Sequence, residues 1–452
     1  MRSVLCDSVA ENLLSSYGKT NKLTIGLLIG QIIENGKDFI VHLAKTPHSE
    51  QKSSSEEEET TEELSNIADI KNSLVAEHAL NAIRMIVGGF NILGLFVVSE
   101  NNIMSDNSAL QKLKTVLMDI KSTLDSNGIL YANTDEQDNG DKLVLNYITS
   151  HKNYICKTIS TDPSKAPSPS PVDFKFVSKG IDWYEFETIY EIDTAFPLLH
   201  SNNHFDTEKH IMATIDDIAG NLAKSIMFFN GDPQSLDTTV EKFLKDGSGD
   251  SSKVKVTIYS EAFQAQLTTN ENGILTPHES LVHYTGIVAS RIYGAPRNTI
   301  AEIERFIRND IIRSITTRLQ IYYDALLAND DGGNDNDEDQ DVNSTIPPRR
   351  VFFHPGNSPI SFCDYLFQNE NEDTTVKQSM EILGVDLNPS DVDISAEAVA
   401  QLKTPEKCDS PGICEETVNL STNDSGKLIL ILGIIGLLVA LIVSVALHFI
   451  LK

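Results

Sequence analysis

A chain of 452 residues is longer than one hydrophobic core usually supports, so the sequence predicts two folded units joined by linkers. Hydrophobic residues make up 40% and charged residues 22%, which is typical of globular proteins and argues against disorder as the main state. The formal net charge of −29 argues against nucleic acid as a partner, because duplex binding needs clustered lysine and arginine.

The first predicted unit, residues 1–165, is a mixed α/β domain that carries an acidic insertion at 49–66. Alternating apolar residues predict strands, and apolar residues at helical spacing predict amphipathic helices. In chain order these are strands at 23–31 and 39–46, a helix at 73–86, a strand at 90–100, a helix at 107–124, and strands at 142–150 and 153–160. The strand from Phe90 is apolar throughout, which indicates burial on both faces.

The second predicted unit, residues 166–387, is also mixed α+β and follows a boundary in the Pro/Ser-rich stretch 161–174. Its predicted elements are a strand at 183–198, a helix at 207–224, strands at 254–258 and 282–293, a helix at 298–327, and short strands within 349–355 and 360–367. The acidic run 329–341 interrupts this unit as a flexible loop and does not keep the spacing of a calcium-binding loop.

The end of the chain has the composition of a membrane anchor. Residues from Leu428 to Leu451 are apolar apart from Ser444 and His448, and they are long enough to cross a bilayer as one helix. Because the N-terminus lacks the apolar core of a secretory signal, we expect a tail-anchored protein with its body in the cytosol. Residues 388–427 are predicted to be a polar linker between body and anchor. Five cysteines, an odd number, also fit a reducing compartment.

The strand-strand-helix-strand order of the first unit, with "GLLIGQ" (Gly26–Gln31) on the first strand, resembles the MPN fold of zinc deubiquitinases and their inactive relatives. In active members, the strand after the helix ends in His-x-His, a Ser-x-x-Asp follows, and an early glutamate acts as general base. Here that strand ends "FVVSENNIMSD", and no histidine occurs from Ala79 to Ser150. Ser105 and Asp106 cannot hold zinc alone, and Glu34 lies in a turn. The resemblance therefore implies an inactive domain without a metal, a cofactor or catalytic residues.

Other candidate residues carry weaker signals. Glu77 and His78 are adjacent on a helix and point about 100° apart, so they do not share a face. His204 and His210 are six residues apart, which is a poor spacing for a metal pair. Cys363 and His354 lie on neighbouring predicted strands, as a thiol hydrolase would require, but Cys363 lies in an apolar strand where cysteine usually acts as a small hydrophobe. A divergent hydrolase of the thiol or metal type, anchored to the cytosolic membrane face, therefore stays open as the alternative function.

Several segments together resemble the odorant-response-abnormal protein four (Odr-four-like) family. They are "GLLIGQ", "AEHA", "RMIVGGFNILGLFV", "PPRRVFFHPGN" with "CDYLF", and the terminal apolar anchor, in this order.

This resemblance implies a non-catalytic protein of the endoplasmic reticulum membrane. Such a protein assists the folding and trafficking of seven-helix receptors and holds a cysteine protease specific for a ubiquitin-fold modifier at the membrane. Since MPN-like domains commonly pair with one another, the resemblance makes exposed residues of the first unit candidates for partner docking, namely Glu77, His78, Arg84, Met85 and Phe90.

Overall fold

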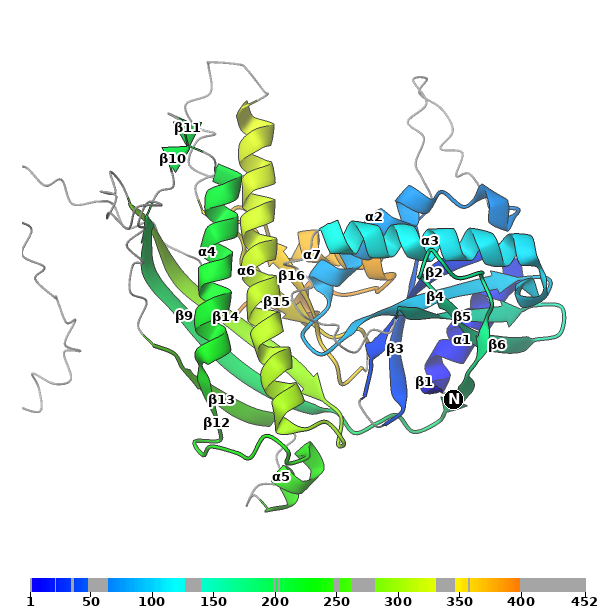
Figure 1. The fold of residues 1–452 in the computed structure, drawn as a ribbon, viewed down its shortest axis with the longest axis horizontal. Helices are drawn as coiled ribbons and strands as arrows, with labels where there is room; N and C mark the ends of the chain where they lie inside the picture. The colour runs from blue at the N-terminus through cyan, green and yellow to red at the C-terminus, as the bar shows by residue number, and fades with distance from the viewer. Residues whose placement is uncertain are drawn as a thin grey trace, which may run out of the picture. The chain divides into compact units, whose positions relative to one another are not determined.

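The structure is a computed structural model. It describes residues 2–20, 22–33, 36–47, 64–126, 140–197, 200–201, 204–205, 207–246, 253–261, 281–330, 346–356 and 358–398. All of these belong to one compact unit that comprises residues 1–401 (Figure 1). The predicted division into two domains near residue 165 stays a prediction. The described strands form three larger sheets and one two-stranded ladder.

The first sheet has eight strands in the order β7-β6-β5-β4-β2-β3-β1-β8. Its strands are β1 (Ser3–Asp7), β2 (Thr24–Gln31), β3 (Asp38–Lys45), β4 (Asn91–Ser99), β5 (Asp141–Ile148), β6 (Asn153–Ser160), β7 (Ser170–Pro171) and β8 (Asp173–Val177). Strand β1 is parallel to β3 and β8, and β4 is parallel to β5, while the other pairs are antiparallel.

The two outer strands of this sheet meet. Only Val172 separates β7, which pairs with β6, from β8, which pairs with β1. The Tyr154 ring of β6 contacts the rings of Phe174 and Phe176 of β8 at centroid distances of 5.5 and 4.9 Å. The first sheet therefore closes on itself through residues 170–177, which lie beyond its predicted end at residue 165.

Helices cover both faces of the first sheet. These are α1 (Ser8–Tyr17), α2 (Asn72–Met85) and α3 (Asn107–Ser126), with short 3-10 turns η1 (Gly18–Thr20), η2 (Ile67–Asp69) and η3 (Ile103–Ser105). The apolar faces of α2 and α3 pack with one side of β2 and β4, as Ala79, Leu113 and Leu27 do. The other side packs with Leu14 of α1. Every residue of β2 is consequently buried.

The two glycines of "GLLIGQ" allow this close packing. A Cβ atom on Gly26 would lie 2.3 Å from the Ala44 carbonyl oxygen, and one on Gly30 would lie 2.2 Å from the Phe39 carbonyl oxygen. The pairing of β2 with β3 shifts register between Ile29 and Gly30, which marks a bulge. Both glycines thus permit backbone contact that any side chain would prevent.

The second sheet has the order β12-β13-β9-β14 and is covered on one face by two long helices (Figure 1). Its strands are β9 (Tyr184–Pro197), β12 (Ile226–Phe229), β13 (Lys253–Tyr259) and β14 (Leu281–Gly294), and the helices are α4 (Thr207–Lys224) and α6 (Ile300–Asp330). Helix α5 (Val240–Asp246) and the small ladder of β10 (His200–Ser201) with β11 (His204–Phe205) complete this part.

The third sheet, in the order β16-β15-β17, is formed by the last described residues. It contains β15 (Arg349–Phe353), β16 (Phe362–Leu366) and β17 (Val392–Asp393), with α7 (Glu372–Gln378), the π-helical turn η4 (Ser379–Leu383) and the 3-10 turn η5 (Pro389–Asp391). Val392 pairs with Phe353, and Glu397 is only 2% exposed. The predicted linker at 388–427 therefore begins too early, because Val392 and Glu397 are buried in the body.

The mixed α+β class and the predicted helices and strands are confirmed for the described residues. The membrane anchor predicted at 428–451 lies outside them, as do most of the acidic segments 49–66 and 329–341. Within the part of the chain that the structure describes, no helix combines the length and apolarity needed to span a membrane.

Candidate functional site

Two of the segments that carry the family resemblance, those with Gly88 and Arg350, meet at one buried carboxylate. Asp310 of α6 accepts two hydrogen bonds from the Arg350 guanidinium of β15, at 2.7 and 2.9 Å. The Ser290 hydroxyl donates to the same carboxylate at 2.6 Å and the Gly88 backbone N–H at 2.7 Å. Asp310 and Arg350 are both 0% exposed. We call Asp310, Arg350, Ser290 and Gly88 the junction cluster, because they join the α2–β4 turn, β14, α6 and β15.

The charge of Arg350 depends on this pairing. Burial alone would lower the pKa of the Arg350 guanidinium, but the charge and hydrogen bonding of Asp310, together with Cys363 and Tyr365, raise that pKa well above its usual value. The remaining Arg350 contacts are to the Ala289 carbonyl oxygen and the Cys363 sulfur, both at 3.2 Å. The buried pair is therefore hydrogen-bonded on both sides, as a buried ion pair must be to persist.

The junction cluster also requires close backbone contact at Gly88. A Cβ atom there would lie 2.6 Å from Cβ of Asp310 and 2.7 Å from the Phe306 carbonyl oxygen. One turn along α6, the Arg313 guanidinium donates to the Ile86 carbonyl oxygen at 3.1 Å. The "RMIVGG" segment thus lies directly against α6, and its backbone supplies part of the hydrogen bonding.

Charged and amide side chains cover the outer edge of β14. Glu397 accepts from the Ala289 N–H at 2.7 Å and from the Arg350 N–H at 2.8 Å, and Arg318 pairs with the same carboxylate. The Ala289 carbonyl oxygen accepts from Arg350, and the Tyr293 carbonyl oxygen accepts from Gln31 Nε2 at 3.0 Å. Unpaired strand edges invite pairing with other chains. Side chains from β2, α6 and residues 350–397 occupy this edge instead.

Two imidazoles hold the η4 turn against the first sheet. Nε2 of His42 lies 2.8 Å from the Leu383 carbonyl oxygen, and Nε2 of His78 lies 2.7 Å from that of Ile382. A carbonyl oxygen only accepts, so both Nε2 atoms carry a proton. Burial lowers the pKa of both imidazoles, although the carbonyl contacts oppose this effect. His42 and His78 are therefore neutral at pH 7 and act as hydrogen-bond donors.

The predicted docking residues are mostly buried by the chain itself. Met85 and Phe90 are 2% exposed and His78 is 4% exposed. Arg84 is half-buried, and its NH2 group lies 3.4 Å from Gln320 Oε1, while Glu77 is exposed. The proposed surface is thus wrong for His78, Met85 and Phe90, because the chain itself buries them: His78 bonds to η4, and Phe90 packs on Trp183. For Glu77 and Arg84 the docking role stays a prediction.

The segment in which the sequence resemblance would place a zinc site carries amide and hydroxyl groups and one carboxylate. At the end of β4, Asn146 donates to the Ser99 hydroxyl at 2.8 Å and accepts from the Ile103 N–H at 3.1 Å. Ser105 donates to the Asn102 carbonyl oxygen, and Asp106 accepts from the Ser108 N–H at the start of α3. These neutral oxygens and a helix-capping carboxylate do not fit the ligand set that zinc prefers. Among the described residues, no three His, Cys, Asp or Glu residues gather into a metal site, and Glu34 lies outside them.

The predicted thiol pair is not assembled. The register of β15 and β16 places Phe352, not His354, opposite Cys363. Cys363 is fully buried beside Arg350, and burial raises the pKa of its thiol, whereas His354 is exposed. His210 is buried and stacks on Tyr284. The side chain of His204 lies outside the described part of the chain. The expectation that His204 and His210 do not bind a metal together therefore stays a prediction.

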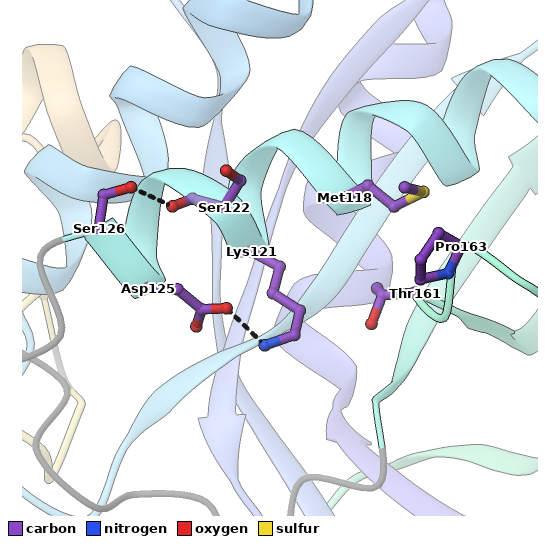
Figure 2. Close-up of a pocket in the computed structure, with 7 residues that line it drawn as sticks. All are labelled: Met118, Lys121, Ser122, Asp125, Ser126, Thr161 and Pro163. Atoms are coloured by element: carbon purple, nitrogen blue, oxygen red, sulfur yellow. Dashed lines mark hydrogen bonds and ion pairs between the residues drawn. The ribbon is translucent and has the colours of Figure 1, made fainter.

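One shallow depression lies beside α3 and has a volume of about 420 Å³ (Figure 2). It is lined by Met118, Lys121, Ser122, Asp125, Ser126, Thr161 and Pro163. Its polar groups pair along the helix: Lys121 contacts Asp125 at 2.7 Å and Ser126 contacts Ser122 at 2.8 Å, as Figure 2 shows. No set of charged groups in this depression converges on a ligand position.

The second sheet leaves apolar side chains exposed on the face opposite α4 and α6. Ile226 and Tyr259 are register partners on β12 and β13 and are 61% and 60% exposed, and Ile189 of β9 is 63% exposed. A sheet face that meets water normally carries polar residues at such positions. We call Ile189, Ile226 and Tyr259 the outer-face patch.

Fold and site together define a class: a mixed α+β protein whose sheets are joined by a buried ion-pair cluster. The model of the ODR4-like family, Odorant response abnormal 4-like, matches residues 26–394, and the chain belongs to this family, as the sequence predicted.

Relatives named "Protein odr-4 homolog" share similarity over most of the chain. The Drosophila melanogaster protein is 27% identical over 100% of this chain and 99% of its own length. The Xenopus laevis protein is 24% identical (90% and 89%), and the Homo sapiens protein is 22% identical (88% and 86%). A crystal structure of UfSP from C. elegans covers 85% of this chain and 57% of its own, with a TM-score of 0.44 and 6% identity. A likeness of that size carries no argument about fold or function.

Proposed function

We propose that this chain is a non-catalytic adaptor of the endoplasmic reticulum membrane, with an inactive MPN-like first domain and a C-terminal tail anchor. It recruits a ubiquitin-fold-modifier-specific cysteine protease to the membrane and assists the folding and trafficking of seven-helix receptors. The observation that supports the proposal is the Asn146-centred hydrogen-bond network at the end of β4, in the segment where the MPN resemblance would place the ligands of a zinc protease. Family membership and the apolar segment 428–451 support the rest.

An adaptor of this kind acts by raising the local concentration of its bound partner at the membrane. A protease held at the membrane meets membrane-bound substrates at a high effective concentration without any chemistry from the tether. The alternative, a divergent hydrolase, has less support, because Cys363 is buried with a raised thiol pKa and pairs with Arg350 instead of an imidazole. A nucleophilic cysteine needs the opposite environment.

The first experiment separates membranes from cytosol. Deletion of 428–452 should move both this chain and its protease partner into the cytosolic fraction. A matched control replaces 428–451 with an unrelated apolar helix of equal length, and both proteins should then remain with the membranes. If the protease stays membrane-bound when the anchor is deleted, the recruitment proposal fails.

The second experiment locates the docking surface, which we assign to the outer-face patch because His78, Met85 and Phe90 are covered. The double substitution I189E/Y259E should abolish co-purification of the protease from detergent-solubilised membranes. The control is Val9→Glu, an isolated exposed apolar residue of 70% exposure on α1. Equal capture of the protease by both variants would contradict this surface.

A further inference from the structure

A short proline-serine segment lies between the two ends of the first sheet. It comprises residues 166–171, "APSPSP", in which Ser168 and Ser170 are exposed and each directly precedes a proline. A residue before proline is held in an extended conformation, and proline itself offers no backbone N–H. The segment therefore presents two serine hydroxyls on an extended, exposed backbone.

Both hydroxyls are accessible for chemistry. Among the described residues, neither the Ser168 nor the Ser170 hydroxyl takes part in a hydrogen bond. Ser168 lies outside the strand pairing, and only its backbone N–H is bound, to the Ala166 carbonyl oxygen at 2.7 Å. Ser170 belongs to β7, where its backbone pairs with Thr158 of β6. Ser168 is therefore the more accessible of the two.

A third serine in the same turn provides the contrast. Ser164 is also exposed, but its hydroxyl donates to Asp162 Oδ1 at 2.7 Å, and its backbone N–H donates to the same atom at 2.9 Å. Lys165, not a proline, follows it. Ser164 thus has the same exposure without the free hydroxyl and without the proline.

The surroundings favour a phosphate group. Lys165 precedes Ser168 by three residues; its side chain is 63% exposed, and its amine lies 3.7 Å from Asp162 Oδ2. Lys157 of β6 is the register partner of Pro171. The buried Lys114 amine binds the carbonyl oxygens of Asp162 and Lys165 and so adds positive charge under the turn. A dianion placed near several lysines gains electrostatic stabilisation.

We infer that Ser168, followed by Ser170, is a phosphorylation site for a proline-directed serine kinase. The Ser168 Oγ attacks the γ-phosphorus of ATP and forms an O–P bond, while the bond between the γ-phosphorus and the bridging oxygen breaks and ADP leaves. The hydroxyl proton passes to the catalytic aspartate of the kinase. A kinase of this class accommodates proline directly after the serine, so the missing N–H is no obstacle.

The test uses the full chain in detergent micelles with ATP and a purified cyclin-dependent kinase, followed by phosphosite mapping by mass spectrometry. We expect phosphate to appear first on Ser168 and then on Ser170. The initial rate of phosphate incorporation should be at least 10-fold lower for S168A/S170A. The variant P169A/P171A keeps both serine hydroxyls, and its initial rate of phosphate incorporation should fall to a similar extent.

Three results would overturn the inference: comparable phosphate on Ser164, no incorporation above the kinase-free control, or an unchanged rate in either double variant. Emission of Trp183, the sole tryptophan, should be unchanged in both variants and so show that they are folded.

Discussion

The junction cluster makes a strong quantitative prediction for the variant Asp310→Asn. The amide keeps one acceptor oxygen but removes the charge that balances Arg350, and Arg350 is 0% exposed. Breaking a buried ion pair by removing one partner costs about 3–5 kcal/mol, because the other charge stays buried. With an m value of about 3 kcal/mol/M, we expect the urea midpoint to fall by roughly 1–1.7 M.

The assay is urea unfolding of the full chain in detergent micelles, followed by tryptophan fluorescence. Trp183, the sole tryptophan, is 9% exposed and lies edge-on to Phe39 and Phe90 at centroid distances of 5.9 and 5.1 Å. Phe90 also contacts Tyr293 of β14. Trp183 therefore reports directly on contact between the first and second sheets.

Two further variants isolate the cause. The pair D310L/R350M removes both charges and should recover most of the lost stability, because apolar replacement of a buried pair is often neutral or better. Lys121→Ala breaks an exposed i,i+4 pair on α3 and should cost no more than about 0.5 kcal/mol. The reasoning is refuted if Asp310→Asn costs no more than Lys121→Ala, or if the double variant is as unstable as the single one.

Three other substitutions test separate parts of the structure. Burial raises the pKa of Asp364 from 3.8 to about 6, and a difference of about 2 in pKa corresponds to about 3 kcal/mol. Because the folded state binds this proton more tightly than the unfolded state, the free energy of unfolding rises as pH falls through 6. Asp364→Asn should therefore raise the free energy of unfolding at pH 7.5 by up to that amount and leave it unchanged near pH 4. Burial lowers the pKa of His42, so the contribution of this imidazole to the free energy of unfolding is present above pH 6.5 and is lost as pH falls below that value. His42→Gln, which can still donate to Leu383, should therefore reduce the drop in urea midpoint between pH 7.5 and 5.5, and an unchanged drop would argue against the neutral imidazole. Gly30→Ala should cost about 1–3 kcal/mol or more through its clash with backbone atoms. Its control Gly220→Ala, in α4 with open space around it, should stabilise by about 1 kcal/mol, and similar thermal midpoints for the two would contradict the clash.

Local periodicity was sufficient to predict the longer elements. Helix α4 is predicted at its observed bounds, and strands β2 to β6 of the first sheet within two residues at each end. The elements missed are short or polar. Strand β1 has five residues, and β7 and β8 lie in a Pro/Ser-rich stretch that resembles a linker. Their strand identity comes from pairing with β6 and β1, which no local pattern reveals.

The candidate site was less predictable for the same physical reason. Asp310 looks like a polar residue on a helix, and its partners Gly88 and Arg350 are 222 and 40 residues away. His42 was not singled out, because its partner is a backbone carbonyl 341 residues later. Residues 388–398 were predicted to be a linker from their polarity, yet Glu397 binds three partners inside the body. Long-range hydrogen bonds leave no periodic signal in sequence.

The closure of the first sheet through residues 170–177 has a consequence for synthesis on the ribosome. Strand β1 is made first, but its neighbour β8 emerges only after six other strands. Glu397, which satisfies the edge of β14, then lies 103 residues after Gly294, the last residue of β14, or on the order of 5–20 s of translation at 5–20 residues per second. During that interval the nascent chain carries an uncapped strand edge, so we expect chaperones to bind this protein while it is still attached to the ribosome.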